Sequence, residues 1–407
     1  MSHLIVFSHL RWAFVFQRPQ HLLSRLARHF HVVFVEEPVP CEAPAGLERS
    51  SPCAGVEVLR PHTPLAATGF HDEQLALLRG LLTAYLAEAR IDDYAVWFYT
   101  PLALPLLDVL SPRAVVYDCM DELSAFKLAP PQLREREAAL LARADLVTTG
   151  GPRLYAAKRD HNANVLCLPS AVDAAHYSPA RATADAAGMA RAAELQGEIG
   201  TPRLGFFGVI DERLDLDLVA RIADADPAWQ LVMVGPVVKI DPMTLPRRPN
   251  LHWLGQQDYS ILPQLVAGWD VCLMPFARNE STEFISPTKT LEYMAAAKPV
   301  VSTPIHDVEA LFGELVAIAP TADAFIGACR AALTESDAER TSREQKMRAC
   351  VGRYSWDTTA ATIAGALDAV LDDKQRVANA PAGRTTSRLV SAAGGALHSL
   401  RLGDVLG

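Results

Sequence analysis

Short apolar runs alternate with longer amphipathic stretches along this 407-residue chain, and this alternation constrains the fold more than any other feature. It is typical of βαβ units, in which crossover helices join parallel strands. We predict an α/β protein with strands at 3–8, 31–37, 94–100, 114–119, 145–150 and 164–170 in the first half. In the second half we predict strands at 203–210, 229–235, 251–255, 270–276, 299–304 and 315–320.

The alternation is interrupted by an Ala-rich polar segment, SPARATADAAGMARAAELQGEIGTP, at 178–202. Because the chain is too long for one ordinary core, we predict two doubly wound, Rossmann-like domains that face each other across a cleft. Such sheets bind ligands beyond the carboxyl ends of their strands. The expected parts are a first domain at 1–178, a linker at 179–202, a second domain at 203–352, a closing helix at 353–373 and a flexible basic tail at 374–407. A weak amphipathic helix at a membrane surface is the alternative for the tail.

Composition excludes several classes of function. The net charge of -9 and the pI near 5.8 argue against a nucleic-acid partner. The seven cysteines are scattered and form no C-x-x-C pair, which favours a reduced cytoplasmic protein without structural zinc. The opening MSHLIVFSHLRWAF is expected to be a strand rather than a signal peptide, and any membrane contact, at the inner face, is expected to be peripheral. The chain contains neither a G-x-G-x-x-G after a strand nor a Walker A loop, which argues against an oxidoreductase or an ATPase.

The stretch SPTKTLEYMAAAKPVV carries the clearest candidate site. Ser286 suits an N-cap and Pro287 suits the first position of a helix, so we predict that a helix begins here. Lys289 and Glu292 are three residues apart and share one face of this helix. A lysine and a helix N-terminus can neutralise a diphosphate, and a carboxylate can accept hydrogen bonds from ribose hydroxyls. The alternative is a solvated ion pair worth a few tenths of a kcal/mol.

This stretch and the preceding NLHWLGQQDYSILPQLVAGWDVCLMPF resemble the nucleotide-sugar site of glycosyltransferases with two Rossmann domains, the GT-B architecture. The resemblance is strongest to family four, and covers nearly the whole chain. FVFQRPQHLLSRLA and VVYDCMDELSAF are similar to a bacterial polysaccharide-biosynthesis branch of that family. VLCLPSAVDAAHYSP resembles its usual interdomain connector, and YSW at 354–356 resembles the start of its closing helix.

The resemblance implies roles for several residues of the second domain. Glu292 is similar to the ribose-binding glutamate, and Lys289 would lie beside the diphosphate. Arg213 resembles a basic residue that contacts the donor phosphates, and Gly208 would let the backbone approach the ligand closely. The remaining donor-binding candidates are Ser286, Pro287, Thr288 and Glu283.

Two positions depart from the family pattern. Glu283 stands one residue out of register with the family's first glutamate, which contacts the donor sugar. Ala297 occupies the position usually taken by a glycine after the helix. A left-handed alanine there would cost roughly 1 kcal/mol, unless the helix ends differently.

Polar residues of the first domain are candidates for the acceptor side. Arg11, Gln17, Arg18 and His21 lie near the start of a helix expected at Pro19, where basic residues oppose the helix dipole and indicate an anionic partner. Ordinary surface residues are the alternative.

Two carboxylates, Asp118 and Asp121, end the strand at 114–119. One of them could orient the acceptor hydroxyl or balance positive charge on the sugar, and the alternative is that Asp121 caps a helix. Their D-x-x-D spacing differs from the D-x-D of metal-dependent transferases, so we expect no metal and no other cofactor.

We therefore predict a glycosyltransferase that moves a sugar from a nucleoside diphosphate donor to a hydroxyl acceptor. Arg213, Lys289 and the helix N-terminus would stabilise charge on the leaving diphosphate. The resemblance implies retention of anomeric configuration and a lipid-linked or oligosaccharide acceptor. A non-catalytic partner protein that binds a sugar nucleotide and a nucleotide-sugar epimerase are the alternatives.

Overall fold

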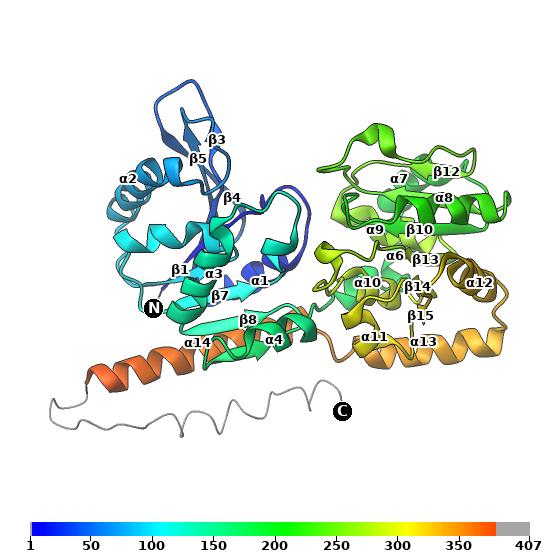
Figure 1. Cartoon of the computed structure of the whole chain (residues 1–407). Helices are drawn as coiled ribbons and strands as arrows, with labels where there is room; N and C mark the ends of the chain where they lie inside the picture. The colour runs from blue at the N-terminus through cyan, green and yellow to red at the C-terminus, as the bar shows by residue number, and fades with distance from the viewer. Residues whose placement is uncertain (1, 380–407) are drawn as a thin grey trace. The chain divides into compact units, whose positions relative to one another are not determined.

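The computed structural model describes residues 2–379 and divides them into two compact units, each built on one sheet (Figure 1). The first unit holds the chain up to Pro169 and again from Trp356, and the second unit is Ser170–Ser355. The α/β class and the two doubly wound sheets are confirmed. The predicted tail at 374–407 lies outside the described residues from position 380 onwards.

Within the described residues, the first sheet has the order β3-β5-β2-β1-β6-β7-β8-β9, with β4 paired to β5. Every pair along this path is parallel, and β4 with β5 is antiparallel. The strands are β1 (His3–Ser8), β2 (His31–Glu36), β3 (Val39–Pro40), β4 (Gly46–Cys53), β5 (Val56–Thr63), β6 (Tyr94–Phe98), β7 (Val115–Cys119), β8 (Leu146–Thr149) and β9 (Val165–Cys167).

Three of these strands, β3, β4 and β5, were not predicted. β4 reads GLERSSPC and is mostly exposed, so it has no apolar alternation that a sequence pattern could reveal. β5 contains Pro61, a residue disfavoured within strands, and its pairing with β2 ends at Leu59, before that proline. The six strands predicted for this half correspond to β1, β2, β6, β7, β8 and β9, with small shifts at their ends.

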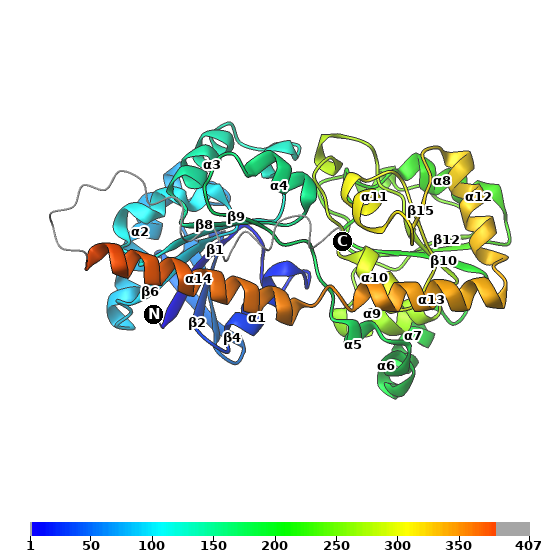
Figure 2. The same cartoon turned by 90° about the horizontal axis from the view of Figure 1, so that it is seen from below.

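Helix α1 (Arg18–Leu26) contacts the chain at two points: where the chain leaves the first unit and where it re-enters that unit. On the outgoing side, Arg18 Nη1 donates to the carbonyl of Leu168 at 3.0 Å, next to the unit boundary. On the return side, His21 stacks on Trp356 with ring centroids 4.9 Å apart, and Arg25 pairs with Asp357 at 3.0 Å. Trp356 begins α14 (Trp356–Ala378), which packs along α1 (Figure 2).

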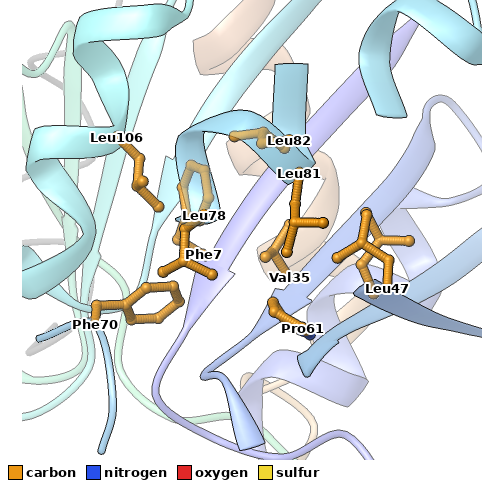
Figure 3. A pocket seen from close by; sticks show the side chains of 10 residues that line it. Phe7, Val35, Leu47, Pro61, Phe70, Leu78, Leu81, Leu82 and Leu106 are labelled. Atoms are coloured by element: carbon orange, nitrogen blue, oxygen red, sulfur yellow. The ribbon is translucent and has the colours of Figure 1, made fainter. Parts of the chain in front are cut away.

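The other helical elements of the first unit connect its strands. They are α2 (Asp72–Glu88), η1 (Pro101–Val109), η2 (Leu123–Ala125), α3 (Gln132–Arg143) and α4 (Pro152–Lys158). A small apolar cavity lies in the core between β1, α2 and η1, where Phe7, Leu78 and Leu106 line it (Figure 3). It measures about 10 Å³, room for about one water molecule, so this core is closely packed.

The second sheet has the order β12-β11-β10-β13-β14-β15, and all its pairs are parallel within the described residues. Its strands are β10 (Arg203–Phe207), β11 (Gln230–Val234), β12 (Leu251–Trp253), β13 (Val271–Met274), β14 (Val300–Ser302) and β15 (Ala317–Ile318). All six strands predicted for the second half are therefore present.

Helices cover both faces of the second sheet (Figure 2). α8 (Leu216–Ala225) and α12 (Ala322–Leu333) share an apolar core with one face, and α9 (Leu262–Ala267) and α10 (Lys289–Ala295) lie on the other. The other helical elements are α5 (Ala174–Tyr177), α6 (Pro179–Ala184), α7 (Ala186–Gln196), η3 (Pro242–Thr244), η4 (Tyr259–Ile261), η5 (Glu280–Thr282), α11 (His306–Phe312) and α13 (Asp337–Val351). Residues 179–202, which we expected to form a linker, contain α6 and α7 and lie in the second unit.

Helix α10 begins later than predicted. Its N-cap is Thr288, without a side-chain hydrogen bond, so the prediction that Ser286 caps the helix is wrong by two residues. The backbone turns first at Pro287, whose carbonyl accepts the Thr290 N–H at 3.2 Å, and regular helical bonding follows from Thr288.

The end of α10 forms a Schellman motif around a left-handed alanine. Ala297 has φ +59°, its N–H donates to the Met294 carbonyl, and the Lys298 N–H donates to the Tyr293 carbonyl, both at 3.0 Å. This geometry normally uses a glycine, because a Cβ is disfavoured in the left-handed region. Ala297 therefore carries backbone strain.

Replacing Ala297 with glycine should stabilise the protein by about 1 kcal/mol, because the strain is larger than the entropy that glycine adds to the unfolded chain. Urea unfolding followed by circular dichroism measures this. The matched control is Ala296→Gly, because Ala296 has an ordinary φ of −78° and glycine there should destabilise the protein. A loss of stability in Ala297→Gly would contradict the account of the helix end.

Candidate functional site

The carboxyl edge of the second sheet brings Lys289 against the backbone of Gly208. Gly208 directly follows β10 and has φ +145°, a conformation that side chains rarely adopt. A Cβ at this position would lie 3.0 Å from Lys289 Cε and 3.3 Å from Lys289 Nζ. The ammonium group of Lys289 therefore lies against backbone that carries no side chain. A larger residue at position 208 would displace the ammonium group.

Arg213 lies in the loop after β10 and is held by a bidentate ion pair. Its Nε donates to both carboxylate oxygens of Asp211, at 3.0 and 3.1 Å, and its Nη2 donates to Oδ2 at 2.7 Å. The Arg213 carbonyl accepts the Ala277 N–H at 2.8 Å, which ties this loop to the one after β13. Arg213 keeps 24% of its side chain exposed, so its guanidinium is fixed but accessible.

Lys289 has aromatic neighbours and a weakened charge. Its Nζ lies 5.1 Å from the ring centre of Phe276 and 5.6 Å from that of Phe206, which are cation–π distances. The pKa of Lys289 is lowered to about 8, chiefly by burial and also by the nearby Arg213, while Glu292 and Asp211 act in the opposite direction. Lys289 is thus poised to gain a full charge when an anion approaches.

Glu292 lies one turn further along α10 and is 6% exposed. Its pKa is raised to about 7, because the effect of burial exceeds the opposing effects of the Lys289 charge and the Tyr177 hydroxyl. A half-buried lysine beside a buried glutamate, with pKa values that approach each other near neutrality, is unfavourable for folding. Perturbed groups of this kind are enriched in functional sites. The alternative of a solvated ion pair is therefore wrong.

Sequence analysis missed Gly235, which lies beside Gly208 at the end of β11. Gly235 has φ +147°, and a Cβ there would meet the Gly208 carbonyl oxygen at 1.8 Å. The segments RLGFFG and WQLVMVG share one pattern, an apolar strand that ends in glycine, and this signal could have identified the pair. Sequence analysis also missed four contact residues, and no comparable sequence pattern marks them. They are Asp211, Phe206, Phe276 and Tyr177.

The other donor-side candidates surround the start of α10. The Ser286 carbonyl accepts the Ser170 hydroxyl at 3.0 Å, and Pro287 and Thr288 form the first turn before the helix. Glu283 directly follows η5 and is exposed. The structure therefore brings Gly208, Arg213, Lys289 and Glu292 into one cluster, and Ser286, Pro287 and Thr288 lead into it.

In the first unit, Asp118 and Arg18 form a buried ion pair. Arg18 Nε donates to Asp118 Oδ2 at 2.9 Å and Arg18 Nη2 donates to Oδ1 at 2.9 Å, while the side chains are 3% and 0% exposed. The Thr148 hydroxyl also donates to Oδ1, at 2.7 Å. Arg18 thus finds its anionic partner inside the protein, and both carboxylate oxygens of Asp118 are occupied.

The remaining acceptor-side candidates also have contacts within the first unit. Arg11 pairs with Glu36 at 3.2 Å, Gln17 is the N-cap of α1, and His21 is buried against Trp356. Asp121 follows β7 and is partly exposed, but the N-cap of the next helical turn, η2, is Glu122. Asp121 is therefore the more accessible of the two candidate carboxylates.

The structure also bears on the expectations about metal and membrane contact. Among residues 2–379, no group of three or more His, Cys, Asp and Glu side chains could hold a metal ion. Over the same range, no helix has both the length and the apolar character to cross a membrane. Metal-independent chemistry stays a prediction.

Residues 201–335, which contain the whole cluster from Gly208 to Glu292, match the family model "Glycosyl transferases group 1". The chain is also 28% identical over 254 residues to TuaH of Bacillus subtilis, whose name describes a glycosyltransferase of teichuronic acid biosynthesis. That similarity covers 58% of this chain and 61% of TuaH, so the chain spans less than two thirds of this relative.

Similar solved structures cover nearly the whole chain. Sucrose-phosphate synthase from Thermosynechococcus elongatus has a TM-score of 0.70 at 17% identity, over 92% of this chain and 100% of that chain. Anabaena HepE in complex with UDP-glucose has a TM-score of 0.67 at 14% identity, over 91% and 100%. α,α-Trehalose 6-phosphate synthase from Burkholderia multivorans has a TM-score of 0.65 at 14% identity, over 93% and 100%. The two Rossmann-like sheets of the GT-B fold are confirmed, and residues 201–335 form a group 1 glycosyl transferase domain.

Replacing Asp118 with asparagine should destabilise the protein by about 3–5 kcal/mol, because it leaves Arg18 buried without a countercharge. Urea unfolding measures the loss. Asp121→Asn is the control, and its partly exposed carboxylate predicts a change within about 0.5 kcal/mol. If Asp118→Asn were as stable as the parent, the pair would not have the structural role inferred here.

Proposed function

We propose that this protein is a glycosyltransferase that moves a sugar from a nucleoside diphosphate donor to a hydroxyl acceptor in polysaccharide synthesis. The observation that carries the proposal is the cluster of Lys289, Arg213 and Glu292, in which Lys289 lies against the bare backbone of Gly208. It lies at the carboxyl edge of a parallel sheet, where such sheets bind ligands. The cluster also lies within the segment that matches the group 1 glycosyl transferase model.

The two cations suit a diphosphate leaving group. As the bond between the anomeric carbon and the diphosphate breaks, negative charge grows on the phosphate oxygens and positive charge grows on the sugar. Arg213 is held in place by Asp211, and Lys289 is held between Phe206 and Phe276, so neither needs to reorganise when the charge develops. The diphosphate would raise the pKa of Lys289 back toward its ordinary value and keep it protonated.

Glu292 suits the ribose of the donor. Its carboxylate is buried one turn after Lys289, and an ionised carboxylate can accept hydrogen bonds from both ribose hydroxyls. Ligand hydroxyls would then replace the water that burial removes from Glu292, which favours its ionised form. We assign Ser286, Pro287 and Thr288 to the donor loop and Glu283 to the sugar end of the donor.

Other parts of the proposal rest on similarity. Anabaena HepE has been solved with UDP and with UDP-glucose, which makes a UDP-sugar the first donor to test. The name of TuaH supports a polysaccharide product, and we propose retention of configuration without a metal. All seven cysteines lie among the described residues as free thiols, which supports a reducing, cytoplasmic location. Of the first-unit candidates we retain Asp121 for the acceptor hydroxyl and assign Asp118 and Arg18 to structure.

Calorimetric titration with UDP, GDP and dTDP tests the donor site. One nucleotide should bind the parent protein, and Lys289→Ala should weaken that binding by about 1–3 kcal/mol, the scale of a lost charged partner. Lys346→Ala is the control. Lys346 lies on α13, so this substitution removes the same charge elsewhere in the unit. If no nucleotide binds, or if both variants weaken binding equally, the proposed site is refuted.

The same titration across pH tests the state of Lys289. Below a pKa of about 8 the ammonium is protonated and attracts the diphosphate, and above it a proton must be taken up first. The affinity should therefore fall about fivefold to tenfold between pH 7.5 and 9. In Lys289→Arg, which stays charged over this range, the affinity should change little. An equal pH dependence in both proteins would contradict the role of Lys289.

A further inference from the structure

Tyr177 is the last residue of α5, and aromatic side chains enclose its ring. It is 1% exposed, and α5 packs against α10, the helix that carries Lys289 and Glu292. The Tyr177 ring stacks on Phe207, with centroids 6.0 Å apart and planes 6° apart. His176 and Tyr259 contact it edge-on, with centroids at 5.0 and 5.9 Å. The ring is therefore held from several sides in one orientation.

The hydroxyl of Tyr177 is buried without a hydrogen bond. Within residues 2–379, no donor or acceptor has hydrogen-bond geometry with it. A buried hydroxyl in this state has lost its water without gaining a partner, which is unfavourable for folding. A phenylalanine would fill nearly the same space without this cost. Packing alone therefore does not account for a tyrosine at this position.

Glu292 is the charged group that acts most strongly on this hydroxyl. Burial raises the pKa of Tyr177 well above its ordinary value, and the negative charge of Glu292 raises it further. The hydroxyl in turn counteracts the rise in the pKa of Glu292. Both effects are expected of a phenol close to a carboxylate, because the phenol proton favours the ionised acid. The hydroxyl is therefore close to Glu292, although the two do not have hydrogen-bond geometry in this structure.

Two other polar groups around the ring have partners of their own. The Tyr293 hydroxyl accepts the Phe207 N–H at 3.0 Å, and His176 Nε2 lies 3.0 Å from the carbonyl oxygen of Tyr259. A carboxylate is also the stronger acceptor, because hydrogen bonds to an ionised group are shorter and stronger than neutral ones. The Glu292 carboxylate is therefore the acceptor that suits the Tyr177 hydroxyl best.

We propose that Tyr177 is a positioning residue for the donor ribose, and that its hydroxyl donates to Glu292 in the donor complex. A carboxylate has about four lone-pair sites, so Glu292 can accept from Tyr177 and from both ribose hydroxyls at once. A donor without those hydroxyls would leave part of this buried carboxylate unpaired, which costs affinity. The site therefore selects ribonucleoside diphosphates over their deoxy forms. This inference rests on the proposed donor site.

Calorimetric titration of the full-length protein compares the ribonucleotide that it binds, UDP or GDP, with the 2′,3′-dideoxy form of that nucleotide. The parent should bind the ribonucleotide at least about tenfold more tightly. Tyr177→Phe keeps the ring, so it should fold like the parent. It should bind the ribonucleotide about tenfold more weakly than the parent and the dideoxy form equally well. Tyr85→Phe is the matched control, because it removes a buried hydroxyl from Glu57 in the first unit, and it should leave both affinities unchanged.

A double substitution tests whether the hydroxyl acts through Glu292. In Glu292→Ala the hydroxyl has no carboxylate to hold, so adding Tyr177→Phe should change the ribonucleotide affinity less than about twofold. Losses that add up in the double variant would assign the hydroxyl to a different contact and would overturn the inference.

Two results with a parent that binds a ribonucleotide would also overturn it. In one, Tyr177→Phe binds the ribonucleotide as tightly as the parent does. In the other, it loses affinity for both forms equally, as a packing defect would cause. The proposed donor site survives both results, because the parent still binds its nucleotide. A parent that binds dTDP alone would contradict the selection of ribonucleotides and keep the donor site, whereas a parent that binds no nucleotide would refute the donor site itself.

Discussion

The chemistry proposed for this protein depends on one unfavourable interaction, between the half-buried Lys289 and the buried Glu292 at the edge of the second sheet. The surroundings lower the pKa of the lysine to about 8 and raise that of the glutamate to about 7, mainly through burial, so the pair carries an electrostatic cost. A diphosphate and a ribose would relieve that cost. Under the proposed function, the pair lowers folding stability and favours donor binding, a pattern expected of functional residues.

Glycines and hydrogen-bonded loops of the second unit surround this pair. Gly208 and Gly235 follow neighbouring strands and approach so closely that a Cβ on Gly235 would collide with the Gly208 carbonyl. Asp211 holds Arg213, and the loop after β10 is bonded to the loop after β13. In the first unit the corresponding edge is built differently, because Arg18 and Asp118 neutralise each other internally and anchor the chain near Leu168. In the second unit, by contrast, Arg213 is paired with Asp211 but keeps 24% of its side chain exposed.

Many of the strands and the charged pair of the candidate site could be predicted from sequence. Strands such as β1 and β10 are buried apolar runs, and Lys289 and Glu292 are near in sequence, so a local pattern could reveal both. β4 was not predicted because it is polar and exposed. The start of α10 was predicted too early because Ser286 and Pro287 resemble an N-cap and a first helical residue. The partner of Arg18 could not be predicted because Asp118 is 100 residues away, and only the fold brings them together.

Hydrogen–deuterium exchange with and without UDP tests the central claim most directly, because it locates the ligand on the chain. The account predicts that UDP slows exchange in peptides covering 205–213 and 288–296, which contain Gly208, Arg213, Lys289 and Glu292. It predicts no change in α13 of the same unit. Protection confined to other segments, or no protection at saturating UDP, would contradict the assignment of the donor site.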